Sequence, residues 1–516
     1  MEAANRRWTW AAFALLGCTA LIPLLAPVFP TQDGPVHLYY VDVLRDVLKH
    51  SAPYAQHFEI KRLLTPYALE YYGLLALETL FSAWMSERLL LVGYIVVFCL
   101  GFRYLVESVA ERGSPWILAG IPFCLHMMVY MGFLNFSVAV ALLLFQCGYW
   151  IRHSGNLTKG QVTALLIGLM LMLLTHPVPV AVFLLFAGVY LACDVGSAGS
   201  TWKERLSRRW RPFLLLAAMG VMALAWVSLF VDSVQRGDSA PNYLSSWGWF
   251  NVLATELQLF PVSAFTRVRD RAGPILLAGV ACIILLEGLW SNRRTLRQAP
   301  IALAVTSGIC FVLFGIVPAR VNGSYYFAER FPIIMVLFLL AGAAAMPLAR
   351  AWTGRVGYLA AAVSAGVLIL QWGNVSEISF QIALAEDAAP AAAGSVGLLI
   401  GPRRSTPDGL AFNPYMWSGA HYFLRSRAIL ANEPWMDLPI IMLRPTHPDD
   451  WSYLDPDDAR ERLVDRIAGG GTFKGLDFVV QTGPADVDIH NLMARSGWSH
   501  TGDADDAIRV YRPPGR

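Results

Sequence analysis

The chain has 516 residues, of which 56% are hydrophobic and only 15% are charged. Soluble globular proteins carry charge at nearer a quarter of their positions, so this composition excludes an ordinary soluble protein. The formal net charge of +3 is too small to indicate a nucleic-acid-binding protein. All seven cysteines lie inside apolar runs, which excludes a domain held together by disulfide bonds.

Apolar runs of about 17 residues or more, the length that crosses a hydrocarbon layer, recur between Trp8 and Trp372. After Gly373 no long apolar run follows, and Asp, Pro, Gly and Arg become common. We therefore predict a transmembrane helix bundle over 1–373 and a small α/β soluble domain over 374–516. The first run is long for a signal peptide and lacks a clear cleavage site, which favours an uncleaved first helix.

Clusters of Lys and Arg beside the spans predict the orientation, because such clusters stay on the cytoplasmic side. The stretch Tyr67–Trp84 carries Glu70 and Glu78, and carboxylates are costly at a bilayer centre, so we interpret it as an interfacial helix. The chain is then a multi-pass α-helical membrane protein with about eleven spans, at 8–29, 86–106, 115–131, 135–151, 160–176, 178–195, 212–232, 273–290, 300–317, 331–349 and 355–373.

This count places the N-terminus in the cytoplasm. The outer loop 30–85 and the C-terminal domain are predicted to lie on the other side, in the periplasm. The general character of the chain indicates a bacterial inner membrane.

The segment Thr31–His37 follows the first span directly and is the sharpest polar feature of the chain. Asp33 is predicted at the outer membrane surface, where a carboxylate can have a raised pKa and act as a base. The residue is equally suited to cap the following helix, because Asp before a Pro-containing first turn does so well. His37, from the same segment, is a second candidate catalytic residue.

The layout resembles the GT-C class of membrane glycosyltransferases, which use polyprenyl-phosphate-linked sugars. Asp33 matches the acidic residue that opens the first outer loop of that class, and Tyr39–His50 with Tyr67–Trp84 match its interfacial helices. The chain also ends in a strand–helix–strand pattern similar to the small outer domain of GT-C-like bacterial proteins, at 475–480, 489–496 and 507–512. The resemblance implies transfer of a sugar from the carrier to a glycan, lipid or protein acceptor on the outer face.

One outer turn departs from that class. Many GT-C enzymes carry a second acidic residue between spans three and four, sometimes for a divalent metal. Here the turn 132–136 reads Gly-Phe-Leu-Asn-Phe, so we predict neither a metal site nor a cofactor, and Asn135 is expected to hydrogen bond the substrate.

Two further outer segments carry candidate residues. His176 lies in a tight turn and is either a structural hydrogen-bonder or a catalytic group on the same side as Asp33. In the loop 318–330, Arg320 and Arg330 either clamp a lipid phosphate or anchor headgroups and pair with Glu329. Tyr325 of this loop is a further candidate for binding the substrate. The resemblance to GT-C enzymes implies that Arg320 and Arg330 bind the lipid phosphate.

Two alternatives stay open. The chain could be a non-catalytic GT-C-like component of polysaccharide or glycolipid assembly or translocation. It could also handle lipid-linked glycans as a polymerase or ligase does. Convergence of Asp33, His176 and Arg320 on one outward cavity would favour the enzyme.

In the tail, the aromatic and polar segment 413–422 either recognises an acceptor or belongs to the core of the small domain.

Overall fold

The computed structural model describes residues 2–60, 64–110, 113–193, 202–231, 263–291, 298–317, 326–383, 390–401, 410–432, 443–445, 454, 456–469, 476–483, 486–501 and 508–513. The chain forms two compact units. The helical unit comprises Met1–Ile22, Leu91–Met128 and Leu134–Trp372. The mixed unit comprises Pro23–Leu90, Val129–Phe133 and Gly373–Arg516.

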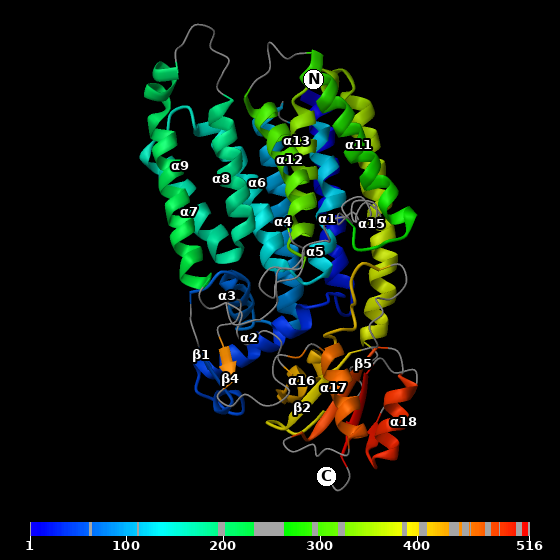
Figure 1. Ribbon diagram of the computed structural model, residues 1–516. Helices are drawn as coiled ribbons and strands as arrows, with labels where there is room; N and C mark the ends of the chain where they lie inside the picture. The colour runs from blue at the N-terminus through cyan, green and yellow to red at the C-terminus, as the bar shows by residue number, and fades with distance from the viewer. Residues whose placement is uncertain are drawn as a thin grey trace. The chain divides into compact units, whose positions relative to one another are not determined.

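Long apolar helices build the helical unit (Figure 1). By residue number, the ends of three of them, α1, α4 and α15, are assigned to the mixed unit. Their bounds are α1 (Glu2–Leu25), α4 (Ala83–Val109), α6 (Leu134–His153), α7 (Lys159–Thr175), α8 (Pro177–Ala192), α9 (Trp202–Val231), α11 (Val268–Ser291), α12 (Gln298–Ile316), α13 (Phe331–Ala344), α14 (Pro347–Ala351) and α15 (Thr353–Ala383).

Seven helices of the described part are long and apolar enough to cross a membrane. They are Arg6–Leu25, Ala83–Val109, Leu134–His153, Trp210–Ser228, Val268–Ser291, Gln298–Ile316 and Gly354–Phe380. Shorter apolar helices cover Ala68–Leu77, Pro115–Tyr130, Lys159–Thr175 and Pro177–Ala192. The predicted multi-pass helical fold is confirmed, and the count of eleven spans stays a prediction.

Burial separates central from peripheral helices within this unit. Nearly every residue of α13 is buried, and the helix packs against α11 and α12. By contrast, Val221 and Leu224 of α9 are 67% and 73% exposed. A helix apolar on all sides must be surrounded either by protein or by lipid, so α13 is a core helix and α9 presents a lipid-facing surface.

Two predicted spans are not continuous α-helices. The stretch 115–131 forms a 3-10 helix, η2 (Pro115–Phe123), followed by the short α5 (Met127–Tyr130). Pro122 lies inside η2 and lacks the N–H that an α-helix would use. The stretch 331–349 breaks between α13 and α14, where Pro347 begins a new helix for the same reason.

The mixed unit contains a five-stranded sheet in the order β3-β2-β5-β7-β6. Strand β2 (Val396–Ile400) pairs in parallel with β3 (Ile429–Leu430) and β5 (Phe478–Thr482). Strand β7 (Ile508–Arg512) pairs antiparallel with β5 and with β6 (Ser499–Thr501). The predicted α/β character of the tail is confirmed.

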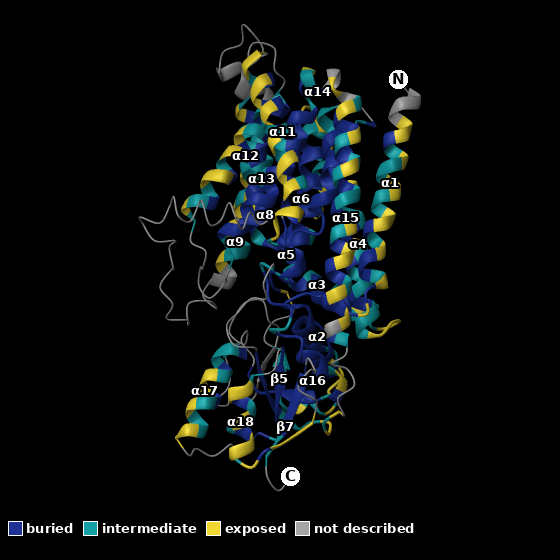
Figure 2. Cartoon of the chain, turned by 90° about the vertical axis from the view of Figure 1, so that its right-hand side faces the viewer, coloured by how far each residue is buried: buried dark blue, intermediate teal, exposed yellow. Residues whose placement is uncertain are grey.

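Both faces of this sheet are covered. Leu398 and Ile400 pack in a cluster with Leu463 of α17 (Pro456–Ala468) and Met493 of α18 (Val487–Arg495), whereas Leu399 packs in a cluster with residues of α16 (Ala420–Ser426). Successive strand side chains point to opposite faces, so β2 needs apolar residues at every position. Figure 2 shows the strands β5 and β7 buried and the outer faces of α17 and α18 exposed.

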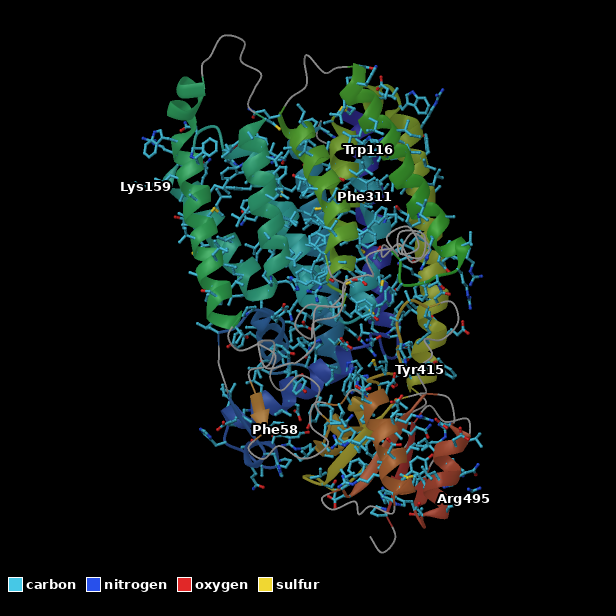
Figure 3. All side chains as sticks on the ribbon, viewed as in Figure 1. Phe58, Trp116, Lys159, Phe311, Tyr415 and Arg495 are labelled. Carbon is cyan, nitrogen blue, oxygen red and sulfur yellow. The ribbon has the colours of Figure 1, made fainter. Side chains whose placement is uncertain are left out.

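The segment between α1 and α4 belongs to the same unit. It contains α2 (Gly34–Leu48), η1 (Tyr54–Gln56), β1 (Phe58–Ile60) and α3 (Ala68–Leu77). Strand β1, marked by Phe58 in Figure 3, pairs antiparallel with β4 (Leu443–Pro445) from the tail. The predicted interfacial helix over 67–84 is shorter than expected: its ten residues in α3 span about 15 Å, too short to cross a bilayer.

Candidate functional site

Backbone hydrogen bonds hold the turn that carries Asp33 in the mixed unit. The Gln32 N–H donates to the Tyr130 carbonyl at 2.8 Å, and the Asp33 N–H donates to the Met131 carbonyl at 3.2 Å. Gly132 has a φ of +84°, and a Cβ there would lie 2.8 Å from the Gly34 nitrogen. The close approach of the two backbones therefore requires glycine at position 132.

The Asp33 carboxylate is buried, with only 6% of the residue exposed. Asp33 occupies the N-cap position of α2, but its side chain makes no capping hydrogen bond; instead its Oδ1 accepts from Gln32 Nε2 at 3.4 Å. Burial raises the pKa of Asp33 to about 7, and the bond from Gln32 opposes this shift. The side chain is therefore not a helix cap, and its pKa suits a base near neutral pH.

His37 lies one helical turn after Asp33 and pairs with a tyrosine that the sequence reasoning missed. His37 Nδ1 and Tyr71 Oη are 2.8 Å apart, and burial lowers the pKa of His37 to about 3. Burial and the nearby carboxylates of Glu70 and Asp33 raise the pKa of Tyr71. His37 is therefore neutral near pH 7, and Tyr71 lies within the electrostatic reach of Asp33.

Glu87 and Asn413 also hydrogen bond the Asp33 turn. Glu87 Oε1 accepts from Thr31 Oγ1 at 3.4 Å, and a Cβ at Gly34 would lie 2.6 Å from the same oxygen. From the tail, the Asn413 N–H donates to Gln32 Oε1 at 3.0 Å. Gln32 thus links the tail to Asp33. In the sequence, Glu87 is a carboxylate in the first turn of a predicted span. Burying a carboxylate there is costly without a partner, and this is the signal that could have identified Glu87 as a site residue.

In the helical unit, His176 and Arg330 form a second polar pair. His176 is the N-cap of α8, and Arg330 is the N-cap of α13. Arg330 Nη1 lies 2.8 Å from His176 Nε2, and Arg330 is only 5% exposed. Its guanidinium also lies 5.9 Å from the centre of the Phe136 ring and 5.5 Å from that of Phe327. Two positive helix ends, a guanidinium and an imidazole thus meet at this position.

The hydrogen bonds of His176 conflict with one another. The Val178 N–H donates to His176 Nδ1 at 3.1 Å, and a neutral imidazole with Nδ1 accepting carries its proton on Nε2. A guanidinium can only donate, so the Nε2–H would then face another donor from Arg330. With two helix N-termini and a guanidinium close together, this position favours negative charge.

The remaining predicted site residues are Asn135, Arg320 and Tyr325. Asn135 lies in the first turn of α6 in the helical unit and is 5% exposed. Arg320 and Tyr325 lie outside the described residues, so the predicted convergence on Arg320 stays a prediction. Within the part of the chain that the structure describes, no group of three or more His, Cys, Asp or Glu side chains is placed to hold a metal ion.

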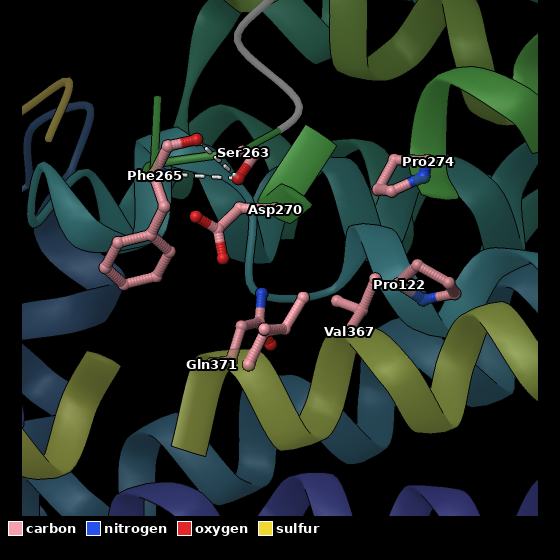
Figure 4. Close-up of a pocket in the computed structure, with 8 residues that line it drawn as sticks. Pro122, Ser263, Phe265, Asp270, Pro274, Val367 and Gln371 are labelled. Atoms are coloured by element: carbon pink, nitrogen blue, oxygen red, sulfur yellow. Dashed lines mark hydrogen bonds between the residues drawn. The ribbon is translucent and has the colours of Figure 1, made fainter. Parts of the chain in front are cut away.

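A small pocket in the helical unit contains none of the predicted residues (Figure 4). It has room for about one water molecule and is lined by Pro122, Ser263, Phe265, Asp270, Pro274, Val367, Leu370 and Gln371. Ser263 Oγ accepts from the Phe265 N–H and donates to its carbonyl, both at 3.2 Å. The pocket is too small for a sugar or a lipid phosphate, so the candidate site is not there.

Comparison with known proteins finds solved structures that are similar to this chain. No protein-family model matches the chain, and no curated protein matches it. Among solved structures it is similar to ArnT from Cupriavidus metallidurans, with a TM-score of 0.53, 14% identity, and 98% of each chain covered. It is also similar to the arabinofuranosyltransferase AftD from Mycobacteria, with a TM-score of 0.51 and 14% identity. That match covers 99% of this chain and 40% of AftD.

Both neighbours have the GT-C fold, and the likeness to ArnT extends over 98% of each chain. At this level of identity the comparison concerns the fold. Together with the apolar helices and the small tail sheet, it shows that the chain is a multi-pass helical membrane protein with a GT-C-like fold.

Proposed function

We propose that the chain is a membrane glycosyltransferase that moves a sugar from a polyprenyl-phosphate carrier to an acceptor hydroxyl on the outer face of a bacterial inner membrane. The observation that carries this proposal is the buried Asp33 carboxylate, whose side chain does not cap α2 and whose pKa lies at about 7. A base at neutral pH needs such a value, and a structural cap does not. The GT-C-like fold supports the same function.

In the proposed reaction, the acceptor hydroxyl gives its proton to Asp33 as its oxygen forms a bond to the anomeric carbon. The bond between that carbon and the phosphate oxygen breaks, and its electron pair leaves with the polyprenyl phosphate. Attack opposite to the leaving group inverts the anomeric configuration. His37 is uncharged in its bond with Tyr71, so we assign it to orienting Tyr71 near the carboxylate.

For the carrier phosphate we propose the pair Arg330–His176. Negative charge develops on the phosphate as the glycosidic bond breaks, and a buried guanidinium stabilises it strongly. The phosphate would also accept from His176 Nε2–H, because Nδ1 accepts from the Val178 N–H. Asn135, Arg320 and Tyr325 remain candidates for binding the same lipid-linked substrate.

The test measures donor turnover by the full chain in lipid nanodiscs. Wild-type protein is incubated with a panel of polyprenyl-phosphate sugars and methyl glycoside acceptors, and released polyprenyl phosphate is quantified by mass spectrometry. We expect release by wild type, and loss of about 100-fold or more in Asp33→Asn with unchanged yield in the membrane. Full activity in Asp33→Asn would refute the role of Asp33. No turnover of any donor by wild type would favour a non-catalytic component of glycan assembly.

A further inference from the structure

His421, in the first turn of α16 of the mixed unit, is 6% exposed. Neither of its ring nitrogens has a hydrogen-bond partner within the described part of the chain. Burial lowers its pKa to about 3, so the ring is neutral and offers one donor and one acceptor. Buried polar groups without partners are rare in proteins, and water or a ligand usually accounts for them.

The ring of His421 lies against an indole. The ring centroids of Trp84 and His421 are 4.0 Å apart, with an interplanar angle of 42°. Trp84, in the first turn of α4, stays half-buried, and Glu87 follows three residues later on the same side of the helix. The half-buried indole thus borders an imidazole with unmet hydrogen-bonding capacity, and a buried carboxylate lies about one turn further along the same helix.

Helix α4, which carries Trp84 and Glu87, and the segment that leads into α16 both hydrogen bond the Asp33 turn. Thr31 donates to Glu87 of α4, and Gln32 accepts from Asn413, which lies eight residues before His421. Gln32 also donates to Asp33. The group of Trp84, Glu87 and His421 is therefore anchored to the same short turn as the proposed base.

The chemistry of the group selects one class of ligand. A lipid chain would cover Trp84 but leave the imidazole unsatisfied. A phosphate would meet the carboxylate of Glu87, which repels it. A sugar ring has an apolar C–H face for the indole and hydroxyls that both donate and accept. We propose that Trp84, Glu87 and His421 form a saccharide-binding subsite for the acceptor, an inference that rests on the proposed glycosyltransferase function.

The kinetic test compares His421→Phe with wild type in nanodiscs, using the best methyl pyranoside or methyl furanoside acceptor. Phenylalanine keeps the ring contact and removes the hydrogen bonds. We expect the acceptor KM to rise roughly tenfold with kcat little changed, and His421→Gln to recover part of the loss. His490→Phe, at a histidine of α18 whose ring meets that of His500 edge-on, is the matched control and should leave KM unchanged. An unchanged KM in His421→Phe would overturn the subsite and leave a buried water as the partner of the ring.

A binding measurement separates this inference from the proposed function. Saturation-transfer NMR detects contact between the full chain and methyl glycosides without any turnover. We expect saturation to pass to the glycoside from wild type and from Asp33→Asn, but not from His421→Phe or Trp84→Leu. Glycerol, a polyol that lacks an apolar ring face, is the negative control ligand. If wild type turns over no donor but this pattern holds, the proposed function fails and the subsite stands. If no saturation passes from wild type to any methyl glycoside, the subsite is rejected.

Discussion

At the residue scale, the buried carboxylate of Asp33 makes the stability of the chain depend on pH. Its pKa rises from 3.8 to about 7 on folding, so the folded state holds the proton more tightly than the unfolded state. The associated stability is present below about pH 4 and is lost as pH rises to about 7. Above that pH, the buried charge destabilises the fold.

Replacing Asp33 with Asn removes this titration. We expect Asp33→Asn to be more stable than wild type at pH 8, by up to roughly 4 kcal/mol, and to differ little at low pH. Thermal unfolding in nanodiscs at pH 5 and pH 8 measures the difference. Asp465→Asn, at an exposed position of α17, is the control for an Asp-to-Asn change on the surface. Equal shifts at both pH values would show that Asp33 is not a buried titrating group.

Arg330 is the second residue whose geometry leads to a testable prediction. Lysine keeps the charge but lacks the planar fork that reaches His176 while lying near two phenylalanine rings. We expect Arg330→Lys to lower kcat/KM for the lipid-linked donor about 10- to 100-fold. Arg355→Lys, which changes an arginine near the Trp352 ring, should have little effect. Similar values for both variants would argue against phosphate binding at Arg330.

At the scale of elements, two glycines set how closely the Asp33 turn packs. A Cβ at Gly34 would lie 2.0 Å from Thr31 Oγ1, and one at Gly132 would lie 2.9 Å from the Asp33 nitrogen. We expect Gly34→Ala and Gly132→Ala to reduce transfer by more than about tenfold, because the turn must shift. Gly93→Ala in α4 meets no atom within 4 Å and is the control for a helical substitution. Normal transfer in both turn variants would show that the position of Asp33 is not critical.

The length of the apolar runs made the long helices predictable, because a membrane span needs a continuous apolar run. The same signal failed at 115–131, where Pro122 favours a 3-10 helix within an equally apolar stretch. Asp33, His37 and His176 stood out as polar residues beside spans. The partners of these residues did not, because the bond between Gln32 and Asn413 joins positions 381 residues apart. A single sequence carries no signal for such a contact.

At the scale of the whole molecule, the predicted orientation assigns the loops to the two sides of the membrane. In a variant with its seven cysteines replaced, Gly155→Cys and Ala494→Cys each introduce one thiol at an exposed position. A membrane-impermeant maleimide added to intact spheroplasts should label Ala494→Cys in the tail and not Gly155→Cys beside Arg152. Both should be labelled after permeabilisation. The opposite pattern in intact spheroplasts would reverse the orientation and move Asp33 to the cytoplasmic side.

The central claim is that Asp33 acts as the base in sugar transfer, and its pH dependence tests this most directly. The rate of transfer at low acceptor concentration is measured between about pH 5.5 and 8.5 in nanodiscs. Since the carboxylate must be deprotonated to accept a proton, the account predicts that kcat/KM rises with pH and levels off above a midpoint of about 7. A rate that stays flat across this range, or a midpoint that persists in Asp33→Asn, would contradict it.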